Sequence, residues 1–270
     1  MDGPDLVRRV AAGVLAVAVS GWLSTLSYGA GGGLTASAST GPAPKAGKRP
    51  AAGSGAAKPS APVRAPLPVD CARAKCVALT FDDGPTESTA TLLDILAARR
   101  VRATFFLIGQ NAAEHPELVR REVEAGHEIA NHSYTHADLG RASEEKVMSE
   151  LTRTQEAVQR ASGVTPVLLR PPYGSTSRRL TSITRRMNMA QILWTVDPLD
   201  WAVRNSRSVE RRVMKAAAPG NVVLMHDIHP TTVAAVPRII DRLAARGFVF
   251  VTVTELFGGR LTPGKKYVQR

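Results

Sequence analysis

Residues 77–85 read Val-Ala-Leu-Thr-Phe-Asp-Asp-Gly-Pro, and this stretch decides the fold. The first five residues are apolar or β-branched, which predicts a buried strand over residues 77–81. The two carboxylates and the Gly-Pro pair that follow are typical of a turn. Parallel β/α folds place their functional groups where buried strands end. Because an isolated Asp-Asp-Gly is more often an ordinary turn, the rest of the chain must support a functional interpretation.

The same alternation of a short apolar run and an amphipathic stretch continues to the end of the chain. Further strands are predicted over residues 103–108, 128–131, 167–170, 191–196, 222–226 and 248–253. Helices are predicted over residues 89–99, 116–125, 143–161, 178–189, 208–217 and 233–245. Several of these helices begin near a serine and end at a glycine. Seven repeated β/α units predict an α/β fold whose parallel strands close into a barrel.

The first 70 residues have a different composition. Arg8 and Arg9 precede an apolar run over residues 10–26, and Ala-Ser-Ala at 36–38 is a cleavage pattern, so we expect a signal peptide over residues 1–38. An uncleaved membrane anchor is the alternative. Residues 39–70 are rich in Pro, Ala, Gly and Ser, which predicts a flexible linker. A folded domain is expected over residues 71–270, secreted and extracellular, cell-wall associated or anchored by the uncleaved segment.

The number of cysteines and the distribution of charge exclude several classes of protein. Two cysteines among 270 residues exclude a four-thiolate metal site and a dense disulfide framework. In an exported protein, Cys71 and Cys76 are expected to form one disulfide. The net charge of +12 comes from scattered arginine pairs without a long basic run or interleaved aromatics. We therefore expect no nucleic-acid partner, and we expect contact with an anionic cell envelope.

A pair of histidines follows the third predicted strand. His132 and His136 have a spacing that would place both imidazoles on one side of a helical turn, where they could bind a divalent metal. The spacing alone is a weak signal, because paired surface histidines are common. With an aspartate from the first strand, however, they would make a set of two nitrogens and one oxygen. Three protein ligands with open positions are typical of a catalytic metal site.

Three more polar clusters follow later strands. They are Arg-Pro-Pro-Tyr-Gly at residues 170–174, Asp-Pro-Leu-Asp-Trp at 197–201 and Leu-Met-His-Asp at 224–227. Each has an ordinary structural explanation when taken singly. Five such clusters at the ends of five strands predict one shared site, because the carboxyl ends of barrel strands meet at one face.

The five clusters, in this order, resemble the motifs of the polysaccharide deacetylase family, the NodB homology domain of carbohydrate esterase family four. The resemblance covers residues 75–257. It implies a deformed β/α barrel with about seven strands. It also implies hydrolysis, dependent on a divalent metal, of the N-acetyl or O-acetyl groups of a polysaccharide.

The resemblance also implies a role for each matching residue. The implied metal ligands are Asp83, His132 and His136, with zinc as the expected ion. The implied catalytic residues are Asp82 as general base, Arg170 as its partner, His226 as general acid and Asp200 as the residue that orients His226. The backbone N–H of Tyr173 would stabilise the oxyanion, and Trp201 and Leu224 would line the slot for the acetyl methyl group. Asp197 is expected to be structural, and His115, His127 and His229 match no ligand position.

The substrate is expected to be an acetylated polysaccharide. Export and a basic domain favour peptidoglycan or a chitin oligomer. One alternative is an acetylxylan esterase of the same family, acting on xylan. Another is a wall carbohydrate-binding protein without turnover, although such a protein would be expected to lack one of the residues named above.

Overall fold

The computed structural model describes residues 69–259 and 261–270. The predicted signal peptide (1–38) and all but the last two residues of the predicted linker (39–70) lie outside this part. Among the described residues, no helix is both long enough and apolar enough to cross a membrane. Cys71 and Cys76 form a disulfide bond that links the segment before the first strand to the second residue of that strand.

Strand β1 (Lys75–Asp82) is the centre of the sheet, and every residue after its first is buried. Its carboxyl-terminal half pairs in parallel with β2 (Thr104–Leu107) and with β6 (Val222–His226). Its amino-terminal end pairs instead with β7 (Phe248–Phe250). The register places Asp82 directly beside His226. Two polar side chains far apart in sequence thus reach the same edge of the sheet.

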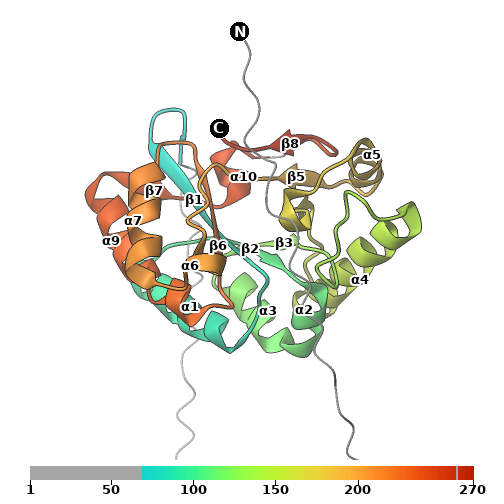
Figure 1. Cartoon of the computed structure of the whole chain (residues 1–270), viewed down its shortest axis with the longest axis horizontal. Coiled ribbons are helices and arrows are strands. Elements are labelled where there is room, and N and C mark those ends of the chain that lie inside the picture. The colour runs from blue at the N-terminus through green and yellow to red at the C-terminus, as the bar shows by residue number, and fades with distance from the viewer. Residues whose placement is uncertain (1–68, 260) are drawn as a thin grey trace, which may run out of the picture. The chain divides into compact units, whose positions relative to one another are not determined.

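The remaining strands continue the sheet in the order β6-β1-β2-β3-β4-β5-β8, and all ladders are parallel (Figure 1). The strands not yet given are β3 (Glu128–Asn131), β4 (Leu168–Leu169), β5 (Ala190–Ile192) and β8 (Lys266–Tyr267). A parallel bridge between Val196 and Val223 returns the chain from β5 to β6. The seven predicted strands are therefore confirmed in a β/α barrel, with β8 as a short addition.

Two of the predicted strands are too long. Beyond β5 the chain changes partner: the Leu193 N–H donates to the Tyr267 carbonyl at 2.8 Å, whereas the Thr195 N–H donates to the Val222 carbonyl at 3.1 Å. The prediction for 191–196 therefore runs across a gap in the sheet. The prediction for 248–253 overlooks a capping box between Thr252 and Glu255, which begins helix α10 (Val253–Leu256).

Six helices of nine or more residues agree with the predicted stretches to within a few residues. They are α1 (Glu87–Arg99), α3 (Pro116–Glu124), α4 (Glu144–Ser162), α5 (Arg178–Arg186), α7 (Ser206–Ala216) and α9 (Val236–Ala245). Besides α10, four other short helical segments were not predicted: α2 (Gly109–Glu114), the 3₁₀ turn η1 (Pro172–Gly174), α6 (Asp200–Val203) and α8 (Pro230–Val233). A single turn is too short to show a helical period.

Successive side chains of β1 point alternately to the outside and to the inside of the barrel. Val77, Leu79 and Phe81 pack with the helices that surround the barrel. Side chains of a strand alternate between faces, so Thr80 and Asp82 point to the other side, into the barrel. The sequence Thr80-Phe81-Asp82 thus directs the carboxylate inward at the strand's end.

Candidate active site

A pocket of about 430 Å³ opens where the strands end. Its walls come from the ends of β1, β3 and β6 and from the loops after β4 and β5. Its lining residues are Asp82, Asp83, His132, His136, Pro171, Tyr173, Trp194, Asp197, Trp201, Leu224 and His226. A volume of this size suits a small ligand or one segment of a polymer.

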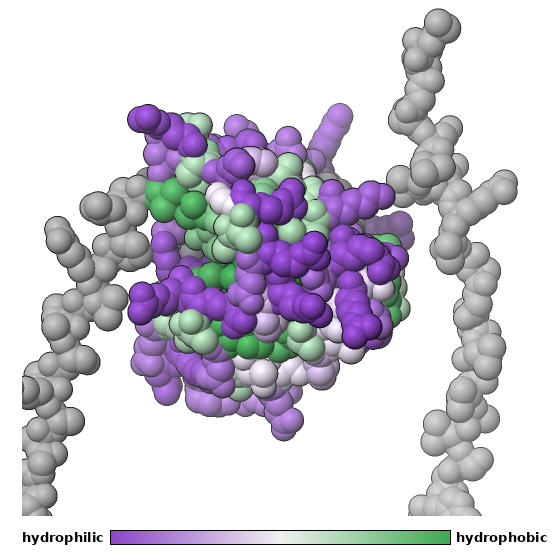
Figure 2. Space-filling model, turned by 90° about the vertical axis from the view of Figure 1, so that its left-hand side faces the viewer, coloured by the Kyte–Doolittle hydropathy of each residue, from purple (hydrophilic) through white to green (hydrophobic). Residues whose placement is uncertain are grey.

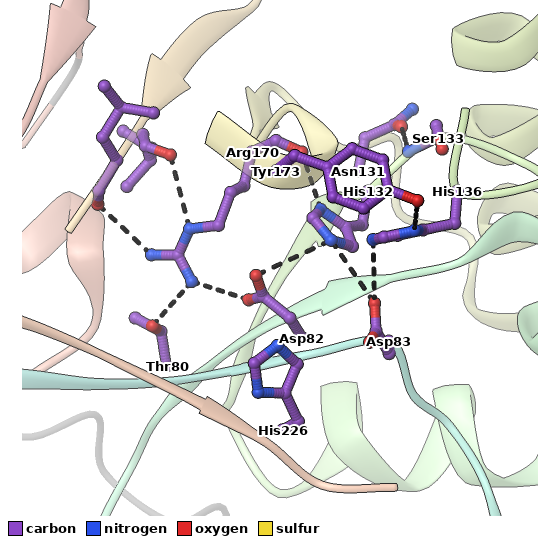
Figure 3. A network of polar contacts seen from close by, with 12 residues as sticks. Thr80, Asp82, Asp83, Asn131, His132, Ser133, His136, Arg170, Tyr173 and His226 are labelled. Atoms are coloured by element: carbon purple, nitrogen blue, oxygen red, sulfur yellow. Dashed lines mark hydrogen bonds and ion pairs between the residues drawn. The ribbon is translucent and has the colours of Figure 1, made fainter. Parts of the chain in front are cut away.

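Asp83, His132 and His136 offer three ligand atoms that lie within 4.8 Å of one another (Figure 3). Asp83 Oδ1 is 3.4 Å from His132 Nε2 and 3.5 Å from His136 Nε2. This oxygen is buried and has no hydrogen-bond partner among the described residues. A buried oxygen facing two imidazole nitrogens is the donor set expected for a divalent cation such as zinc. The three residues therefore fit the implied metal.

Neighbouring groups fix the orientation of both histidine rings. His132 Nδ1 lies 2.7 Å from the carbonyl oxygen of Arg170, so Nδ1 must donate and Nε2 is left to face Asp83. His136 Nδ1 lies 3.1 Å from the Tyr173 hydroxyl. Polar partners of this kind behind a ligating imidazole are typical of metal sites.

The prediction that His132 and His136 share a helical turn is wrong. They lie on an irregular loop in which Ser133 and His136 have positive φ angles of 66° and 58°. Asn131 supports the loop by accepting the Ser133 N–H at 2.8 Å and donating to the Leu151 carbonyl at 3.0 Å. The rings converge, with centroids 5.1 Å apart, because the loop bends back rather than because of helical periodicity.

The electrostatics of the triad favour a charged carboxylate at Asp83 and a neutral imidazole at His136. Burial raises the pKa of Asp83, but the interactions of its carboxylate with the facing imidazoles of His132, His226 and His136 outweigh burial and lower the pKa to about 2. Burial and the His132 charge lower the pKa of His136. Ligands in these protonation states bind metal without first releasing a proton.

Asp82 is held by an arginine that is itself fully buried. Arg170 Nη1 donates to Asp82 Oδ1 at 2.6 Å and to Thr80 Oγ1 at 2.8 Å. The other guanidinium nitrogens face the carbonyls of Ile192 and Leu193, and the plane lies 4.0 Å from the Phe106 ring centroid. Asp82 Oδ2 faces the triad instead, 3.7 Å from His132 Nε2. One carboxylate oxygen is thus anchored and the other is presented to the pocket.

His226 is held by Asp200, which has no exposed surface. Asp200 Oδ1 lies 2.9 Å from His226 Nδ1, and Oδ2 accepts the His226 backbone N–H and the Thr232 hydroxyl, each at 2.8 Å. Burial lowers the pKa of His226, but the hydrogen bond and charge of Asp200, with Asp82 and Asp83, raise it to about 9. The imidazole is therefore a proton donor at neutral pH.

The sequence and the fold of this chain are similar to those of several known proteins. A sequence profile described as polysaccharide deacetylase matches residues 70–192. The peptidoglycan-N-acetylglucosamine deacetylase of Listeria monocytogenes is 40% identical over 73% of this chain and 42% of its own length. A chitooligosaccharide deacetylase of Bradyrhizobium is 37% identical over 66% of this chain and 89% of its own length.

A solved structure described as T48 deacetylase with substrate matches with a TM-score of 0.71 and 42% identity, over 74% of this chain and 99% of that one. This chain belongs to the polysaccharide deacetylase family. The match covers less than half of the Listeria enzyme, so the polysaccharide deacetylase domain is the part that the two proteins share.

The rim of the polysaccharide deacetylase pocket carries exposed aromatic rings. Tyr173 is 71% exposed and Trp201 is 52% exposed, whereas Leu224 is buried in the wall. Asp197 also lines the pocket, although its Oδ1 accepts the Leu199 N–H at 2.7 Å in a local turn. Aromatic faces beside polar groups suit a sugar ring.

Two residues of the site were not predicted. Trp194 lines the pocket because β5 ends at Ile192, and only an earlier end to that predicted strand would have shown it. Asp227 is buried against the Asp-Asp-Gly-Pro turn, where a Cβ on Gly84 would collide with Asp227 Oδ2. Burial, outweighing the hydrogen bond from Thr89, raises the pKa of Asp227 to about 7. Its place next to His226 in the sequence was its only signal.

The other histidines lie apart from the triad. His127 is buried and its Nδ1 accepts the Ala103 N–H at 3.1 Å. The ring of His229 lies 5.9 Å from that of His226, and its Nδ1 is 2.6 Å from Arg204 Nη1. His115 faces Glu117 at 3.7 Å. Neither the triad nor the pocket lining includes any of the three.

Proposed function

We propose that this domain is a metal-dependent hydrolase that removes N-acetyl groups from N-acetylglucosamine residues of peptidoglycan. The observation that carries the proposal is the pairing of Asp82 and His226 on adjacent strands, beside the triad of Asp83, His132 and His136. One is an anchored carboxylate and the other is a charged imidazole. Amide hydrolysis needs both a proton acceptor and a proton donor.

Each residue of the site is proposed to act on the substrate, the water or the metal through a particular atom. Asp83, His132 and His136 would hold a divalent cation, which when bound polarises an acetyl carbonyl and makes water more acidic. Asp82 Oδ2 accepts a proton from the attacking water while Arg170 holds Oδ1 in place. The Tyr173 N–H is proposed to donate to the oxygen that becomes negative.

The second half of the reaction breaks the C–N bond. The proton on His226 Nε2 passes to the departing nitrogen, and Asp200 holds the opposite ring nitrogen. Water and the acetamido group are thereby converted to acetate and a free amine on the sugar. Trp201 and Leu224 are proposed to enclose the acetyl methyl group.

Peptidoglycan is the proposed substrate because relatives at 40% identity carry that name and because the expected export would bring the enzyme to the cell wall. We propose an extracellular, wall-associated location on the basis of the predicted signal peptide and linker. Chitin oligomers are the second substrate to test, since the Bradyrhizobium relative is named for them.

The deciding experiment measures acetate released by the purified protein from peptidoglycan, chitin oligomers and acetylxylan in parallel. Each reaction is run as prepared, after chelation, and after addition of zinc or cobalt. We expect release from peptidoglycan that chelation abolishes and metal restores, and no release by His132→Ala, which loses a ligand. Release from acetylxylan alone would favour the esterase alternative, and metal binding without any release would favour a carbohydrate-binding protein.

A further inference from the structure

Five cations form a strip along α5 and the segment before β8, which we term the α5 strip. The strip consists of Arg178, Arg179, Arg185, Lys265 and Lys266, all of which are exposed. Within residues 69–259 and 261–270, none of the five forms an ion pair. The charges of the strip are therefore available to a ligand in solvent.

Packing makes the strip one continuous surface. Gly264 lies against α5, since a Cβ on Gly264 would be 2.8 Å from the Cβ of Arg185. The neighbouring β8 pairs with β5, which follows α5 in the chain. Figure 1 shows α5 and β8 on the same side of the domain. Residues some 80 positions apart in sequence thus contribute to a single positive patch.

The strip begins at the rim of the pocket. Tyr173, on the pocket wall, lies five residues before Arg178, and Lys266 Nζ is 3.5 Å from Thr176 Oγ1 between them. Arg179 Nη2 donates to the Arg141 carbonyl at 3.2 Å, on the loop that follows the ligand His136. Nine helical residues extend about 13 Å. A chain that leaves the pocket beside Tyr173 would therefore continue over the strip.

The stability of the fold does not explain these charges. Arg178 and Arg179 occupy the first turn of α5, where the helix dipole disfavours cations. On the face that carries α7 and α9, by contrast, Arg242 pairs with Glu210 at 2.8 Å. Figure 2 shows hydrophilic side chains over most of that face. Arg186 on α5 likewise pairs with Glu144, but the five cations of the strip have no such partner among the described residues, which favours an external anion.

We infer that the α5 strip binds carboxylate groups on the peptide stems of the same peptidoglycan strand whose acetylated sugar occupies the pocket. This inference rests on the proposed function. Chitin and xylan backbones offer hydroxyl groups, which gain little from guanidinium and ammonium groups. A strand with a carboxylate-bearing peptide on alternate sugars offers charge-assisted hydrogen bonds at repeated positions. The strip thus selects charged over neutral polymers beyond the reacting sugar.

The test compares two double variants of the intact protein with equal changes in charge. Arg178→Glu with Arg179→Glu alters the strip, and because acids are favoured in the first turn of a helix, α5 should be retained. Arg73→Glu with Lys215→Glu is the control, because both residues are exposed and without an ion pair among the described residues, and they lie just before the amino end of β1 and near the carboxyl end of α7. In β/α units the helices run opposite to the strands, so these ends lie away from the pocket.

We expect the strip variant to raise KM for peptidoglycan about tenfold, an effect that weakens as salt rises, and to leave kcat and KM for a chitin oligomer unchanged. Peptidoglycan with amidated carboxylates should make the unaltered protein behave like the variant. An equal rise in the KM of the control variant for peptidoglycan would show diffuse electrostatic attraction. An equal rise in the KM of the strip variant for the chitin oligomer would show damage to the pocket. Either result, or an unchanged KM for peptidoglycan, overturns the inference.

Sedimentation of each protein with insoluble peptidoglycan separates this inference from the proposed function. The measurement requires no turnover. If only the strip variant cosediments more weakly, binding of peptidoglycan by the α5 strip is supported even if no acetate is released. If both variants and the unaltered protein cosediment equally, binding of peptidoglycan by the α5 strip is contradicted even if acetate release is confirmed.

Discussion

The two sides of the pocket hold their proton-transferring residues by opposite means. Asp82 is 2% exposed and its partner Arg170 is fully buried and permanently charged. His226 retains some exposure, and its partner Asp200 is a fully buried carboxylate. Asp82 and His226 nevertheless sit side by side on β1 and β6. One pocket therefore holds a carboxylate beside a buried cation and an imidazole beside a buried carboxylate.

The difference has a physical basis. A buried carboxylate requires a counter-charge, because an unpaired charge in the interior is very costly. A proton donor must instead be able to lose its charge, so its partner should stabilise the imidazolium without making the proton impossible to transfer. Substitutions on the two sides of the pocket separate these two requirements.

Arg170→Met should be the most damaging change. It leaves the buried Asp82 charge without its partner, which is expected to lower the free energy of unfolding by about 3–5 kcal/mol and to abolish activity. Chemical denaturation measures the loss. Adding Asp82→Asn to Arg170→Met should recover part of the stability, since no buried charge then remains. A double variant no more stable than Arg170→Met would contradict a charge-based explanation.

Asp82→Asn alone should reduce kcat about 10²–10⁴-fold, because the amide cannot accept the proton of the attacking water. Zinc binding, measured by calorimetry, should persist because Asp83, His132 and His136 are unchanged. Lys215→Gln on the exposed face of α7 is a control for preparation and folding. Full activity in purified Asp82→Asn would overturn the assignment of the base.

His226→Gln should reduce kcat about 10²-fold or more on N-acetyl substrates, where the departing nitrogen needs a proton. On an aryl acetate, whose leaving group departs as an anion, the loss should be several-fold at most. Acetate release from both substrates provides the comparison. Equal losses on the two would indicate that His226 acts other than as a proton donor.

Asp200→Asn should produce the smallest effect on activity and the clearest pH dependence. Burial lowers the pKa of His226, but Asp200, with smaller contributions from Asp82 and Asp83, raises it from 6.5 to about 9, so the stabilisation to which Asp200 contributes most is fully present below pH 6.5 and lost as the pH rises through 9. The free energy of unfolding of the metal-free variant should be lower than that of the metal-free unaltered protein by up to about 3 kcal/mol at pH 6, with a smaller difference at pH 10. A difference independent of pH would contradict this coupling.

Much of this arrangement is predictable from sequence, because strand ends in a β/α repeat converge on one face. The periodicity of the long helices and the apolar strand runs, together with the position of Asp82 after Phe81, indicates a barrel with its polar residues at one edge. The motif resemblance assigned roles to residues that the structure places around one pocket. Neither step required knowledge of contacts.

Local geometry was less predictable where tertiary contacts override short-range patterns. The loop from His132 to His136 is bent by Asn131 and positive φ angles, which histidine spacing does not encode. Trp194 became a wall residue because β5 changes partners after Ile192. Lys266 reaches the rim only through the pairing of β8 with β5. Each depends on an interaction between segments distant in sequence.

The two ends of the described domain also meet, at the edge opposite the pocket. The Arg270 N–H donates to the Gly220 carbonyl at 3.0 Å, and the Gly220 N–H donates to the Cys76 carbonyl at 2.8 Å. Cys76 lies six strand residues before Asp82, a distance of about 20 Å. A support or fusion partner joined at either end would therefore leave the mouth of the pocket directed away from the point of attachment. The domain could be displayed on beads from either end with equal access for an insoluble polymer.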